Sequence, residues 1–142
     1  MFEKELSNKL IYLIKQVFKD DNDDLSVISY DEFLEERTSV MVIVGIESTT
    51  QVNYGLDDYQ YDVSITIDSL IADDLTGERF NLVYKKIDEA FRDFLVKIKP
   101  LHELFDEVPV VGFLSTGNNF SITGDSNRVT LAFQIFTSAE MF

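Results

Sequence analysis

The residues best suited to bind a metal ion form an acidic run, Asp20-Asp21-Asn22-Asp23-Asp24. Placed on a calcium-binding loop, this run supplies oxygen ligands at the first, third and fifth positions, and Asp31 falls at the twelfth. The sixth position is then Leu25, where the sharp turn of such a loop requires glycine, and the twelfth lacks the usual bidentate Glu. We therefore expect a solvated helix end here and no calcium site.

A second acidic pair, Asp73-Asp74, stands shortly before Gly77 and Glu78. Carboxylates at such a place accept hydrogen bonds from the free N–H groups of a helix start. Glu78 would lie in the first turn of that helix, where the helix dipole favours negative charge. An aspartate of this pair, or Thr76 after it, is predicted to cap a helix, and the pair is not expected to hold a cation.

Groups suited to catalysis are scarce. The chain has one histidine, His102, and no cysteine, and its serines offer no triad with that histidine. Its glycines form no phosphate-binding motif. We expect no catalytic residue, no metal site and no cofactor, and therefore no enzyme. A metal-dependent hydrolase built on carboxylates remains an alternative.

The charge excludes several partners. The 142 residues contain 26 Asp and Glu against 12 Lys and Arg, for a net charge of −14. Such a chain repels nucleic acids and anionic lipid surfaces at neutral pH. No apolar run approaches 18 residues, and the first residues lack the pattern of a signal peptide, so no membrane association is expected.

Two helices are predicted from apolar residues spaced by three and four, over 2–18 and 77–98. Alternation and β-branched residues predict strands over 25–30, 39–46, 58–70, 108–115, 119–123 and 128–138. The polar residues 47–56 are expected to form a loop or hairpin tip. In 58–70, Tyr61 and Ile65 share the packed face, while Asp68 shares the solvent face.

This order predicts a single α+β domain over 1–142. Two or three strands come before the second helix and two or three after it, an α-β-β-α-β-β order at its simplest. Hairpin-like links between strands favour an antiparallel sheet with both long helices packed on one face.

Three aromatic residues are candidates for a subunit interface: Tyr54 in the polar loop, and Phe136 and Phe142 near the C-terminus. A Met-Phe end on so acidic a chain is expected to pack against something. The alternative is that it folds back onto its own sheet.

The chain resembles the tail terminator (tail completion) proteins of long-tailed bacteriophages. The resemblance rests on the order of its parts: an N-terminal helix, the strand Val40-Met41-Val42-Ile43-Val44-Gly45-Ile46 and a polar loop. The alternating strand from Tyr59 to Ile67 follows, then Asp74-Leu75-Thr76-Gly77 before a long amphipathic helix, and a C-terminal hairpin. Related neck and tail proteins have similar layouts.

The resemblance implies a structural virion protein without catalytic residues. Such subunits form a homohexameric ring that caps the tail tube and joins the head-side connector, after assembly in the host cytoplasm. The expected partners are other copies of the chain, the tail tube protein and the connector protein. An acidic channel would let DNA pass without specific binding.

Two other kinds of protein remain as alternatives. One is an acidic adaptor, assembly chaperone or other neck or tail interaction protein without catalytic activity, and a DNA-mimicking inhibitor belongs to the same class. A mimic needs rows of carboxylates on one face, whereas the acids here are spread through turns and both helices. The other is the carboxylate-based enzyme.

Overall fold

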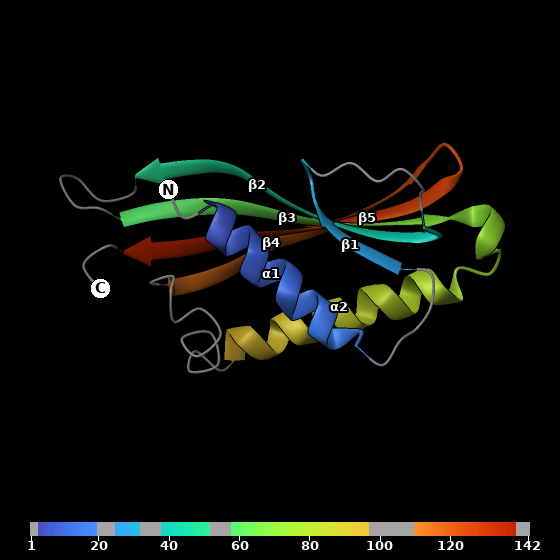
Figure 1. Cartoon of the computed structure of the whole chain (residues 1–142), viewed down its shortest axis with the longest axis horizontal. Coiled ribbons are helices and arrows are strands. Elements are labelled where there is room, and N and C mark those ends of the chain that lie inside the picture. Colours follow the sequence, from blue (N-terminus) through green and yellow to red (C-terminus); the bar gives the residue numbers. More distant parts are fainter. Residues whose placement is uncertain (1–2, 20–24, 32–37, 52–57, 97–109, 139–142) are drawn as a thin grey trace.

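The computed structural model describes residues 3–19, 25–31, 38–51, 58–96 and 110–138 (Figure 1). Along these residues the elements follow in the order α1 (Glu3–Val17), β1 (Leu25–Ser29), β2 (Val40–Gln51), β3 (Asp58–Leu70), the short 3-10 helix η1 (Ile71–Asp73), α2 (Glu78–Val96), β4 (Val110–Thr123) and β5 (Ser126–Ser138). The α+β class predicted from the sequence is confirmed. The order contains one strand more before α2 than the simplest prediction, because residues 25–29 form a strand.

The sheet has five strands in the order β1-β2-β3-β5-β4. The pairs β2–β3, β3–β5 and β4–β5 are antiparallel, but β1 runs parallel to β2. The prediction of an antiparallel sheet is therefore wrong at this edge, and the sheet is mixed. Alternation of apolar residues shows which face of a strand is buried, whereas the direction of its neighbour leaves no mark on that alternation.

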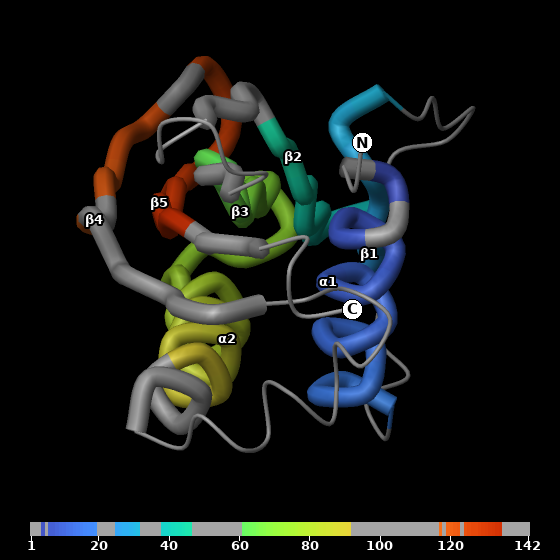
Figure 2. Tube along the Cα trace, turned by 90° about the vertical axis from the view of Figure 1, so that its left-hand side faces the viewer, coloured from blue at the N-terminus to red at the C-terminus, as the bar shows by residue number. Residues whose placement is uncertain are grey.

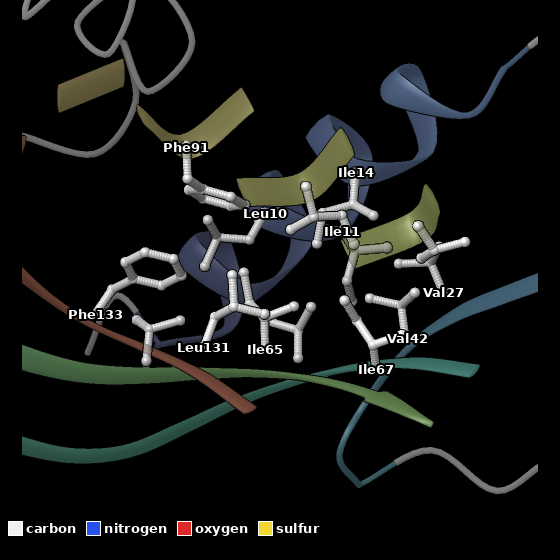
Figure 3. Packing of buried hydrophobic residues seen from close by; sticks show 14 of the residues in the cluster. Leu10, Ile11, Ile14, Val27, Val42, Ile65, Ile67, Phe91, Leu131 and Phe133 are labelled. Atoms are coloured by element: carbon white, nitrogen blue, oxygen red, sulfur yellow. The ribbon is translucent and has the colours of Figure 1, made fainter. Parts of the chain in front are cut away.

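Both helices contribute to the buried cluster on one face of the sheet (Figure 2). Register places Val44, Ile65 and Leu131 side by side across β2, β3 and β5, and each is at most 1% exposed. Leu10 and Ile14 of α1 and Phe91 of α2 belong to the same buried cluster (Figure 3). Burying each such side chain stabilises the fold by roughly 1.5–3 kcal/mol, so this one layer holds the domain together.

Aromatic contacts tie α2 to both of its neighbours. Phe91 stacks on Phe133 of β5, with ring centroids 4.9 Å apart and planes 25° apart. The ammonium of Lys86 lies 5.5 Å from the ring centroid of Phe18, which follows α1 directly. The second helix is therefore fixed against the sheet by one ring and against the first helix by another.

Two strands extend further than the sequence indicated. β2 continues to Gln51 through residues that were expected in a loop, with a bulge between Ile46 and Thr49. β4 is a single strand where two had been expected, and its register shifts between Ser115 and Gly117. Gly117 has φ of +143°, a conformation that glycine adopts readily and other residues rarely do. The register shift can therefore occur at this glycine without ending the strand.

The start of α2 is capped by Asp74. Its Oδ1 accepts a hydrogen bond from the N–H of Arg79 at 3.3 Å, and its Oδ2 accepts one from the N–H of Phe80 at 2.9 Å. These N–H groups have no partner within the helix. The predicted cap is confirmed. The neighbouring Asp73 has a different role, since it accepts a hydrogen bond from the hydroxyl of Ser39 at 3.1 Å.

Replacing Asp74 by alanine is expected to lower the free energy of unfolding by about 1 kcal/mol, because two N–H groups lose their acceptor. Asp74→Asn keeps an acceptor oxygen and should retain most of that stability. Urea denaturation followed by circular dichroism measures both. The control Asp73→Ala removes the same charge from an exposed position and should change stability by less than about 0.5 kcal/mol. Equal losses at the two positions would contradict the assignment of the cap.

Candidate functional site

Of the three predicted interface residues, Phe136 alone lies among the described residues. Tyr54 and Phe142 lie outside the described residues. Phe136 lies in β5, where its backbone is in register with Gln60 of β3 and Gly112 of β4. The three residues therefore stay predictions.

Within the described segments, no three His, Cys, Asp or Glu side chains are grouped as metal ligands would be. Asp74 is engaged as the helix cap, and Asp31, the twelfth position of the calcium-loop alignment, is exposed and accepts a hydrogen bond from the hydroxyl of Ser29. The acidic run 20–24 and His102 lie outside the described residues. The described segments therefore contain no cluster of carboxylates that could bind a metal ion for catalysis.

The face of the sheet opposite the helices is lined by polar pairs. Thr66 and Thr130 are register partners whose hydroxyl oxygens are 3.2 Å apart. Two residues further along, Asp68 and Arg128 form the next pair on this face. Such cross-strand pairs stabilise a sheet and fix its register.

Asp68 was predicted to face solvent, but only 2% of its side chain is exposed. Its Oδ2 accepts two hydrogen bonds from Arg128, at 3.0 Å from Nε and 2.6 Å from Nη2. The guanidinium is 40% exposed, so the ion pair has one buried and one partly hydrated partner. Period-two alternation could not reveal this, because an aspartate on the outer face has the same pattern whether or not an arginine covers it.

Two depressions meet at the end of β1. One, of about 550 Å³, is lined on the helix face by Lys4, Ser7, Asn8, Ser29, Tyr30, Asp31, Val44 and Ile46. The other, of about 390 Å³, is lined by Tyr30, Ile43, Gly45, Ile46, Ser64 and Thr66. Tyr30 and Ile46 line both, so the depressions flank one stretch of β2. Sequence reasoning missed Tyr30, and the one available signal was an aromatic residue directly after a strand.

Large exposed apolar side chains are spread over several elements. Among the described residues they are Tyr12, Tyr30, Leu75, Leu82, Phe120 and Ile122, with Tyr30 76% and Ile122 73% exposed. Phe120 also makes an edge contact with Tyr84 of α2, with ring centroids 4.9 Å apart. Part of this exposed apolar surface therefore lies at the two edges of the sheet. Tyr30 lies at one edge, beside β2, and Phe120 and Ile122 of β4 lie at the other.

A scan against models of protein families gives no match, and no curated protein matches the sequence. Neither α1 nor α2, as far as the structure describes them, is long and apolar enough to cross a membrane.

Removing the arginine partner of Asp68 is expected to destabilise the domain. Breaking a fully buried ion pair costs about 3–5 kcal/mol, and because Arg128 is partly exposed we expect about 2 kcal/mol for Arg128→Ala. Urea denaturation measures the loss. The double variant Asp68→Thr/Arg128→Thr copies the neighbouring threonine pair and should recover part of the stability. No loss in Arg128→Ala would show that the pair contributes nothing.

Proposed function

We propose that the chain is a structural virion protein, a tail terminator subunit that forms a hexameric ring on the end of a phage tail tube. The observation that carries the proposal is a sheet covered by helices on one face, with two different open edges. On one side β4 pairs, among the described residues, only with β5, and on the other β2 continues beyond the end of β1. Two unlike surfaces on one subunit suit a head-to-tail contact, which forms a ring when the rotation between neighbouring subunits closes on itself.

The order of elements supports the same proposal. The resemblance rests on an N-terminal helix, a β-branched strand, an alternating strand, a capped long helix and a C-terminal hairpin. The described chain has these as α1, β2, β3, the Asp74-capped α2 and the pair β4–β5. In this proposal the partners are further copies of the chain, the tail tube protein and the head-side connector.

Acidic side chains gather at one end of the sheet. The N–H of Ile71 donates to the carbonyl of Asp125 at 2.8 Å, which places η1 beside the turn between β4 and β5. Asp73, Glu78 and Asp125 are exposed there. We place this end toward the channel of the ring, where fixed negative charge keeps DNA from adhering. Screening limits this effect to roughly 8 Å at physiological salt, so only acids that face the channel contribute.

The ring is tested by light scattering over a range of concentrations, together with negative-stain imaging. Six copies of a 16.3 kDa chain give about 98 kDa, and the images should show a central hole. Where the purified protein is monomeric, the same images with isolated tail tubes should show it on one tube end. A monomer that leaves tube ends bare and captures a basic protein would overturn the proposal in favour of an acidic adaptor.

Reversing charge at the acidic end should make assembled rings retain DNA. The variant Asp73→Lys/Glu78→Lys/Asp125→Lys is compared with Asp31→Lys/Asp88→Lys/Glu89→Lys, which carries the same net charge elsewhere on the surface. Filter retention of duplex DNA should rise for the first variant and fall steeply between about 50 and 200 mM salt. Equal retention by the two variants would show that this end does not line the channel.

A further inference from the structure

Among the described residues, β1 covers only part of the edge that β2 presents to it. β1 pairs with β2 from Leu25–Val40 to Ser29–Val44, and the N–H of Tyr30 then donates to the carbonyl of Val44 at 2.9 Å. β2 continues to Gln51, and its opposite side is paired with β3 as far as Gln51, apart from the bulge between Ile46 and Thr49. Within the described residues, nothing pairs with the β1 side of β2 beyond Val44.

The main chain of β2 offers hydrogen bonds at this open edge. In a strand, the N–H and C=O groups of alternate residues point to the same side. The carbonyl of Val44 points toward β1, so the N–H and C=O of Ile46 point to that side as well. An unpaired edge of this kind is a template for a further strand.

Each face of this edge carries one of the two depressions. Val44 and Ile46 line the one beside α1, and Ile43 and Gly45 line the one on the far face. A strand placed in line with β1 would send alternate side chains to opposite faces, and so into the two depressions in turn. At Gly45 a Cβ atom would come within 2.9 Å of the Ser64 hydroxyl oxygen, so the glycine keeps the far-face depression open.

We propose that this edge binds the outer edge of β4 from a second copy of the chain. On β4, Phe120 and Ile122 lie on the helix face and are 54% and 73% exposed, while the smaller Asn119 and Ser121 lie on the far face. When the two sheets continue with their helices on the same side, the large apolar side chains enter the depression of about 550 Å³. The small polar ones enter that of about 390 Å³.

This contact deepens the ring proposal and rests on it. It joins two different surfaces, so each copy gives β4 to one neighbour and receives β4 from the other. The main-chain hydrogen bonds supply the attraction and the two depressions set the register.

The natural absence of cysteine allows a direct test. Tyr30→Cys and Ile122→Cys, made as separate variants and mixed, are treated with a short bis-maleimide crosslinker. Dimer yield should exceed by about 10-fold or more that of the control pair Tyr12→Cys and Leu82→Cys, because neighbouring strands raise the effective concentration of the thiols. The controls are exposed residues on the two helices. Equal yields from the two pairs would overturn the inference.

A second pair of variants tests the main-chain hydrogen bonds. Ile46→Pro removes an N–H that points to the open edge, and Ile46→Val keeps it with a slightly smaller side chain. Thermal melting verifies that each variant folds. Loss of the ring in the proline variant alone supports the inference.

The outcomes separate this inference from the ring proposal. A ring that persists in Ile46→Pro and gives no selective crosslink overturns the edge contact and leaves the ring proposal standing. Selective crosslinking in a protein that never forms rings, alone or on tube ends, supports the edge contact and overturns the ring. Failure of both measurements overturns both.

Discussion

The structure depends on one constraint, that the sheet buries a single face. Val42, Ile67 and Val129 are register partners across β2, β3 and β5, and none of them is exposed to solvent. Their partners come from α1 and α2, which lie together on that face (Figure 2). Because the apolar residues of the long strands alternate, a shift of one residue in register would turn the whole buried set toward solvent. The core therefore fixes the strand register before any surface interaction contributes.

One-sided burial gives the other face and the edges different physical roles. Neither described helix covers the outer face, and its central strands are joined there by polar pairs such as Thr66–Thr130 and Asp68–Arg128. These pairs hold neighbouring strands together without adding to the apolar core. At the edges, the groups available for contact are those of the main chain. Among the described residues, β1 forms hydrogen bonds with β2 only as far as Val44. Among the described residues, unpaired main-chain groups are therefore found at an edge of the sheet.

The sequence predicted what depends on local spacing. Alternation in β3 identified the buried Tyr61, Val63, Ile65 and Ile67, and an acidic pair before a glycine identified the helix cap. It did not predict the direction of β1, the extension of β2 or the burial of Asp68, because each depends on a residue distant in the chain. The depressions beside β2 depend on contacts among three elements, so no local pattern indicated Tyr30. Tyr54, Phe136 and Phe142 stay predictions, since no described contact tests them.

The charge of the chain also bears on how copies could join. With 26 acidic and 12 basic residues, identical subunits have too few cations to match their carboxylates across a repeated contact. The six copies of the proposed ring would together carry −84, six times −14. Main-chain hydrogen bonds carry no net charge, so pairing of strand edges does not draw on the scarce cations. Apolar side chains such as Phe120 and Ile122 add burial that is equally independent of charge. In the proposed ring, where acidic side chains face DNA, pairing through the backbone joins the subunits without neutralising them, and the edge of β2 beyond Val44 is where the described chain offers that backbone.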